Sequence, residues 1–183
     1  MVFTEGKKSE PEYVNELKRL PHVDDNVALN LELRPEHGVP LTLVQLAVER
    51  KNDHEVDECW CIFDVEWPRN HPNLKSAVLL AQANGIRLAI SNPCFEVWLI
   101  LHHQELNRFD NTATVESASR ALDRRAGESI DAAFYMPLRR KAAKRAQILD
   151  ARHERNGTKL PHNNPSSGMY KFLMSVEPDS WPC

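Results

Sequence analysis

The spacing of apolar and polar residues predicts a chain in which short strands alternate with helices. Apolar runs typical of strands occupy residues 2–4, 27–33, 59–64 and 86–91. Apolar residues at helical spacing predict helices over residues 10–20, 41–50, 74–84, 92–103, 115–125, 138–155 and 166–176. The segment 35–40, rich in Pro and Gly, is a predicted turn.

The order of these elements predicts the fold class. Strands and helices alternate through residue 91, which favours a mainly parallel sheet of about four strands with helices on both faces. The chain after residue 105 is helical and charged. We therefore expect an α/β domain over residues 1–105 and a helical C-terminal extension, residues 106–183, packed on it. A chain of 183 residues is long enough to bury such a core.

The first eleven residues carry the first candidate functional group. The strand Val2–Thr4 runs into Glu5, and Gly6 then supplies the unrestricted backbone of a sharp turn. Ser9 and Glu12 have the spacing of a capping pair at the start of the next helix. Glu5 is thus placed at the carboxyl end of a strand, which is the edge where open α/β sheets bind ligands.

Two further acids follow the strand over residues 59–64. Asp64 ends this apolar run, and Glu66 lies two residues later, so both side chains point to one side if the strand persists. Three carboxylates, Glu5, Asp64 and Glu66, at one edge would repel each other strongly. A hard divalent cation, Mg²⁺ or Mn²⁺, relieves that repulsion. The alternative, three loop acids that happen to end strands, stays open.

Glu96 is the fourth candidate. It lies in an otherwise apolar segment, 92–103, which Asn92 and Pro93 are expected to begin as a helix. An unpaired buried carboxylate is costly, so Glu96 either faces the acidic edge and works there or forms an ion pair with Lys8 or Arg87. Both alternatives are kept.

Basic residues are the candidate contacts to a substrate phosphate. Lys7 and Lys8 flank the acidic turn. Farther along, Arg140 and Lys144 would share a helical face with Lys141 and Arg145, and that face is a candidate for binding a phosphate backbone. A solvated helix paired with the acidic first part of the chain is an equally good explanation.

Composition limits the classes of function. The chain has 23 basic and 26 acidic residues, a formal charge of −3, so nucleic-acid contacts must come from local patches. No apolar run approaches the roughly 20 residues of a membrane span, and the N-terminus lacks a signal pattern, so we expect a cytoplasmic protein with no membrane contact. Four cysteines without a CxxC pair predict neither a disulfide framework nor a zinc site.

The motifs resemble the RloB family, bacterial proteins of restriction and abortive-infection loci. The matching segments are residues 3–13, 63–66, 91–99 together with His102, and 164–167. This family resembles the Toprim domain of topoisomerases, primases and OLD-type nucleases, in which a Glu after the first strand and an Asp-x-Asp after the third bind Mg²⁺. Here the pair is Asp64-Val65-Glu66, so its second acid departs from that motif.

The resemblance implies a Mg²⁺-dependent nuclease effector in antiphage defence, acting on DNA or RNA, including tRNA. It also implies a partner ATPase of the ABC or AAA type, and it leaves self-association into a homo-oligomer open. In this interpretation Asp64 and Glu66 hold the cation, and Glu5 moves a proton or completes the coordination. Two alternatives remain: a non-catalytic adaptor that regulates an ATPase complex, and phosphoryl or nucleotidyl transfer to a small nucleotide.

Overall fold

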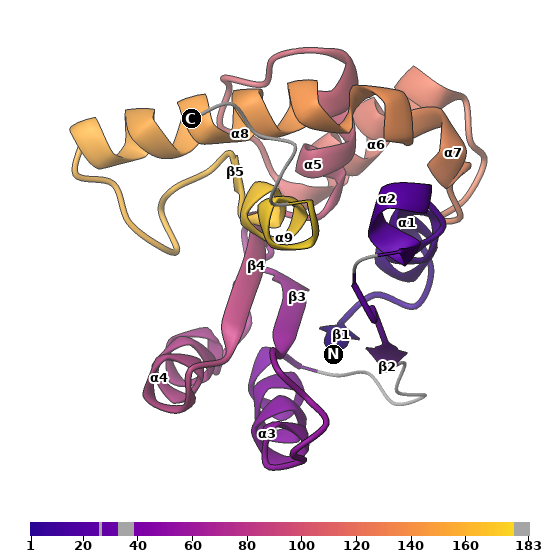
Figure 1. Cartoon of the computed structure of the whole chain (residues 1–183). Coiled ribbons are helices and arrows are strands. Elements are labelled where there is room, and N and C mark those ends of the chain that lie inside the picture. Colours follow the sequence, from indigo (N-terminus) through magenta and orange to yellow (C-terminus); the bar gives the residue numbers. More distant parts are fainter. Residues whose placement is uncertain (26, 33–38, 178–183) are drawn as a thin grey trace.

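A single five-stranded sheet organises the computed structural model, which describes residues 1–25, 27–32 and 39–177 (Figure 1). Its strands are β1 (Val2–Thr4), β2 (Leu31–Glu32), β3 (Trp60–Asp64), β4 (Arg87–Asn92) and β5 (Ser166–Ser167). The spatial order is β2-β1-β3-β4-β5, in which the first four strands are parallel and β5 is antiparallel to β4. The predicted mainly parallel α/β fold is confirmed, with a fifth strand that the sequence pattern had not indicated.

Helices cover both faces of the sheet. They are α1 (Ser9–Lys18), α2 (Pro21–Asp24), α3 (Pro40–Lys51), α4 (Leu74–Asn84), α5 (Glu96–His103), α6 (Thr112–Asp123), α7 (Ala132–Tyr135), η1 (Met136–Leu138), α8 (Arg139–Arg155) and α9 (Met169–Val176). Figure 1 shows α3 and α4 on one face and α1, α5, α8 and α9 on the other. None of the helices within the described ranges has the length and apolar content that crossing a bilayer needs.

The pleat of β3 divides the apolar side chains between two core clusters. Trp60 and Ile62 belong to the cluster under α1, α5, α8 and α9, whereas Cys61 and Phe63 belong to the cluster under α3 and α4. This alternation is expected because successive side chains of a strand point to opposite faces. Since both faces are buried, β3 is apolar at every position except its last.

The larger cluster runs from Val2 to Val176, so residues after 105 share a core with the sheet. At its centre α5 packs against α6 and α8, and Trp98 of α5 is fully buried. The segment after residue 105 thus packs on the sheet, and the domain boundary at residue 105 stays a prediction.

Two predicted elements are shorter than expected. The strand predicted over residues 27–33 is reduced to Leu31–Glu32, and residue 33 lies outside the described residues. Upstream, the N–H of Val27 bonds to the carbonyl of Val23, which continues the preceding helical turn. The turn predicted over residues 35–40 falls mostly outside the described ranges, and α3 begins at Pro40.

Two polar residues, Glu12 and Asn92, have partners that the sequence pattern did not indicate. Helix α1 begins at Ser9 without a side-chain cap, because the carboxylate of Glu12 accepts the backbone N–H of Ile130. Asn92 ends β4 and does not cap α5, because its amide donates to the carbonyl of Pro161 and the side chain of Asn163. The predicted capping roles of Ser9 and Asn92 are therefore wrong.

The helix predicted from Ser166 begins at Met169 instead. Ser166 and Ser167 pair with Asn92 and Ser91 of β4, and the hydroxyls of Ser91 and Ser167 lie 3.0 Å apart. A two-residue edge strand made of serines carries no apolar alternation, so periodicity does not reveal β5.

Candidate active site

An acidic cleft of about 360 Å³ opens where β1 and β3 end. Its lining residues come from the turn after β1, the start of α1, the end of β3 and the loop after it, the start of α5, helix α6 and the loop after α6. They are Glu5, Gly6, Lys7, Lys8, Ser9, Glu10, Asp64, Glu66, Phe95, Glu96, Glu116 and Glu128. The four acids singled out in the sequence thus line one cleft, at the edge of the sheet where ligands of open α/β proteins bind.

Glu5 links the ends of β1 and β3. Its Oε2 accepts the backbone N–H of Asp64 at 3.1 Å, and its Oε1 lies 2.9 Å from Nε2 of His71. The contact with Glu5 is the main reason why the pKa of His71 is raised, although partial burial opposes this effect. His71 is therefore placed to orient Glu5, and its protonated form would compensate part of the charge of that carboxylate.

Asp64 places an uncompensated carboxylate oxygen in the cleft. Its Oδ1 is buried and has no hydrogen-bond partner among the described residues. Burial raises the pKa of this carboxyl well above its usual range, and the charges of Glu10, Glu5, Glu96 and Glu66 raise it further. An ionised Asp64 therefore needs a cation that the described protein groups do not supply.

Glu66 reaches the cleft from a loop, not from a strand. Strand β3 ends at Asp64, and Glu66 has a left-handed backbone with φ of 64°, so the expected continuation of the pleat is wrong. Its Oε2 accepts the hydroxyl of Thr112 at 2.7 Å, and its carbonyl accepts the amide of Asn70. Burial raises the pKa of Glu66, while the bond from Thr112 opposes that rise.

Glu10 is a cleft residue that sequence reasoning missed. It lies in the first turn of α1 and is only 6% exposed, and burial raises its pKa to about 7. Its carboxylate packs over Gly6 so closely that a Cβ there would lie 1.9 Å from Glu10 Oε2. An acid in a first helical turn is usually solvated, so only the folded arrangement identifies it. Glu116 and Glu128 were also missed, because their distant positions in the chain carry no local signal.

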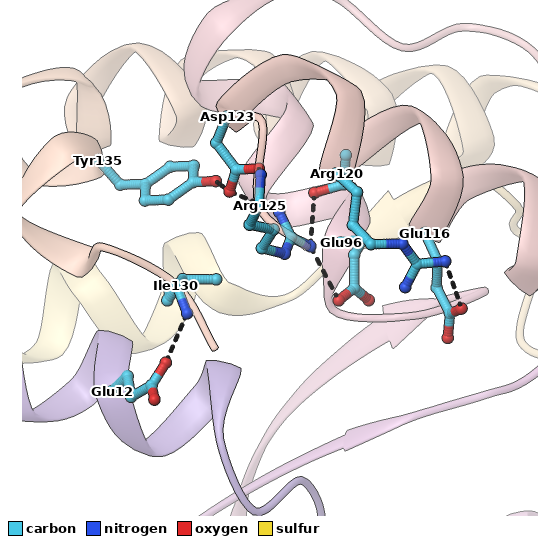
Figure 2. Close-up of polar contacts among 9 residues, drawn as sticks. Glu12, Glu96, Glu116, Arg120, Asp123, Arg125, Ile130 and Tyr135 are labelled. Carbon is cyan, nitrogen blue, oxygen red and sulfur yellow. Dashed lines mark hydrogen bonds and ion pairs between the residues drawn. The ribbon is translucent and has the colours of Figure 1, made fainter. Parts of the chain in front are cut away.

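Glu96 belongs to a buried polar network, shown in Figure 2. It is the first residue of α5, and Nη2 of Arg125 lies 3.4 Å from its Oε1. Arg125 also donates to Asp123 at 2.6 Å, and the hydroxyl of Tyr135 donates to the same carboxylate at 2.5 Å. The partner of Glu96 is thus Arg125 and neither of the two residues that the sequence suggested. Of those two, Arg87 pairs with Glu58 at 2.7 Å.

The predicted phosphate-binding residues lie in two places. Lys7 and Lys8 are exposed and line the cleft. Arg140 and Lys144 are exposed on α8 and do not line it, and Nε of Arg140 lies 3.9 Å from a carboxylate oxygen of Glu177.

Arg145 was expected to share a face with these residues, but it is used inside the fold. Its guanidinium donates to the carbonyls of Leu101 and His102 at 2.6 and 3.0 Å. These bonds cap the end of α5 with a cation, where helix carbonyls lack partners. Arg145 is therefore unavailable to a ligand on the exposed face of α8.

The donor chemistry of the cleft fits a hard divalent cation, because every candidate ligand is a carboxylate oxygen and Asp64 Oδ1 lacks a partner. Within the described part of the chain, no group of three or more His, Cys, Asp or Glu side chains is already arranged to hold a metal ion. The side chains of Glu5, Asp64 and Glu66 would therefore have to rotate toward a common point to bind one.

An open, mostly parallel sheet flanked by helices, with an acidic cleft at the carboxyl ends of its strands, defines an α/β protein. The chain belongs to the RloB-like family, whose model, described as RloB-like protein, matches residues 1–176. No curated protein and no solved structure gave a significant match. The family resemblance is thus confirmed, whereas the likeness to Toprim domains stays a prediction.

Proposed function

We propose that this protein is a nuclease effector of bacterial antiphage defence that hydrolyses phosphodiester bonds of DNA or RNA with Mg²⁺ or Mn²⁺. The observation that supports the proposal is Asp64, a buried carboxylate with an unpartnered oxygen among four other acids. A phosphate is repelled from such a cleft unless a divalent cation is bound there. Membership of the RloB-like family is consistent with the proposal.

Asp64, Glu66 and Glu5 are the residues that would hold the cation. When bound, the cation stabilises the charge that grows on the phosphate oxygens and activates a water molecule. Thr112 fixes the carboxylate of Glu66 by its hydroxyl, and His71 fixes that of Glu5. Such partners orient ligating carboxylates before the substrate arrives.

Three other groups have separate roles in the proposal: Glu10, the pair Lys7 and Lys8, and Glu96. Glu10, with a pKa of about 7, can hold or release a proton near neutral pH, which a general acid or base requires. Lys7 and Lys8 at the mouth of the cleft bind a non-reacting phosphate as point charges. Glu96 is held by Arg125 and acts as an acceptor at the cleft wall.

A non-catalytic adaptor of an ATPase-containing defence complex is the second candidate. Two of the cleft acids already have protein partners, which favours this candidate: Glu5 contacts His71 and the backbone N–H of Asp64, and Glu96 contacts Arg125. Carboxylates with such partners can have a purely structural role. In that case the helical residues after 105 would contact the ATPase, and loss of the cleft acids would leave that assembly intact.

Mn²⁺ binding, followed by calorimetry, and cleavage of DNA, RNA and tRNA test the proposal in the full chain. Asp64→Asn and Glu66→Gln are expected to abolish both, with thermal melts showing that the variants fold. Glu49→Gln, an exposed acid near the end of α3, is the matched control and should change neither. If the wild-type protein binds Mn²⁺ no better than Asp64→Asn, the nuclease proposal is wrong and the adaptor remains.

A further inference from the structure

An exposed aromatic pair lies beside the acidic cleft. The rings of Trp67 and Phe109 meet edge to face, with centroids 5.4 Å apart and planes at 83°. Phe109 is 50% exposed although it is a large apolar residue, and Trp67 is half-buried beneath it. A phenyl ring that the fold leaves half in water has a free face on which another planar group can stack.

Hydrogen bonds tie this pair to the cleft. Trp67 directly follows Glu66 in the chain, and Thr112 joins the two residues. The hydroxyl of Thr112 donates to Glu66 at 2.7 Å and accepts the N–H of Trp67 at 3.0 Å, and the Thr112 N–H donates to the Trp67 carbonyl at 3.1 Å. The aromatic pair is therefore held at a fixed position next to a proposed metal ligand.

Electrostatics alone would not keep a nucleic acid at this site. Seven acids and two lysines line the cleft, and the whole chain carries a formal charge of −3. Part of the affinity for a polyanion must then come from contacts that do not depend on charge. Stacking of bases on aromatic rings is such a contact, and it needs bases whose faces are not already covered by neighbours in a duplex.

We infer that Trp67 and Phe109 form a stacking subsite for an unpaired nucleobase, and that the substrate class of the cleft is single-stranded nucleic acid. Cleavage of such a strand rests on the proposed function, whereas its binding does not. The base would stack on the exposed face of Phe109, and the adjoining phosphate would enter the cleft past Glu66.

A row of basic side chains on α8 continues from this subsite. Arg152 donates to the carbonyl and the side chain of Asn107, both at 3.2 Å, two residues before Phe109. Lys144 and Arg155 are exposed and share the face of Arg152 by helical spacing. Backbone phosphates on either side of the stacked base can contact this row, which would provide the local basic patch that the overall charge lacks.

Binding of labelled oligonucleotides to the full chain tests the inference. We use single-stranded DNA, single-stranded RNA and a duplex of the same sequence, with Asp64→Asn as the background that prevents cleavage. Fluorescence anisotropy should show tighter binding of one or both single strands than of the duplex. Phe109→Ala should weaken that binding about 5- to 140-fold, the range expected for loss of one stacked base. Phe109→Trp keeps a ring and should retain the affinity.

A matched control and an internal probe separate stacking from damage to the fold. Phe134 is 48% exposed and stacks on His103 away from the cleft lining, so Phe134→Ala should leave affinity unchanged. In a Trp181→Phe background, tryptophan fluorescence should be quenched on binding of a single strand, and Trp67→Phe should remove most of the quenching, since Trp60 is 4% exposed and Trp98 is fully buried.

The inference is overturned if the duplex binds as tightly as the single strands. It is equally overturned if adding Phe109→Ala to the Asp64→Asn variant leaves the affinity for single strands unchanged. It is also overturned if Phe109→Ala converts a dimer into a monomer in sedimentation without changing nucleic-acid affinity, because the pair then covers a second copy of the chain. Cleavage of duplex and single strands at equal rates would leave the nuclease proposal standing and remove this one. Phe109-dependent binding of single strands without metal-dependent cleavage would support the stacking subsite and contradict the nuclease proposal.

Discussion

Replacing Glu10 by Gln should make the metal-free protein more stable above neutral pH. Glu10 is 6% exposed, and its pKa is raised from 4.5 to about 7 by burial and by Glu96 and Glu5. A carboxyl whose pKa is raised by folding contributes stability below its unfolded pKa, and this contribution is lost as pH rises through the folded value. At about 1.4 kcal/mol per pKa unit, ionised Glu10 destabilises the folded chain by about 3 kcal/mol.

Thermal melts with a chelator, from about pH 5 to about pH 9, measure this effect. The wild-type melting temperature should fall as pH rises, because the raised pKa values of Asp64, Glu66 and His71 act in the same direction. In the Glu10→Gln variant, the melting temperature should fall by about 6–12 °C less over this pH range than in the wild type. Glu49→Gln, an exposed acid, is the control and should melt like the wild type.

The reasoning is refuted if Glu10→Gln shows the same dependence on pH as the wild type. A second result would also refute it. Saturating Mn²⁺ should restore wild-type stability at high pH, because a bound cation compensates the cleft acids. If Mn²⁺ stabilises the wild type no better at high pH than at low pH, repulsion among the acids is not the cause.

Two further changes test how the cleft is built. Gly6→Ala should weaken Mn²⁺ binding in a calorimetric titration, because the new Cβ would lie 1.9 Å from Glu10 Oε2 and displace that carboxylate, whereas Gly127→Ala meets no atom within 4 Å and should bind normally. Arg125→Ala should lower the free energy of unfolding, measured by urea denaturation, by about 3–5 kcal/mol. The reason is that Glu96 and Asp123, whose side chains are 12% and 9% exposed, lose the cation that they share. A loss as small as that of an exposed ion pair would contradict this account of Arg125.

The parts of the fold that could be predicted from sequence are those set by local patterns. The parallel strands and the acids at their ends were predictable because buried strands are continuous apolar runs, and Glu5 and Asp64 stand where those runs stop. Glu10 was not, because its burial depends on Gly6 and on distant helices. Likewise, Arg125 lies in a loop 29 residues from Glu96, and no periodicity relates a loop charge to a helix residue at that distance.

The pairing of β5 with β4 bears on when the sheet can be completed during synthesis of the chain. Ser166 and Ser167 complete the sheet beside Ser91 and Asn92, and the N–H of Gly168 bonds to the carbonyl of Ile90. Until a ribosome has released residue 168, the edge of β4 is unpaired and the larger core lacks α9. A nascent chain therefore cannot complete its five-stranded sheet before that point of synthesis.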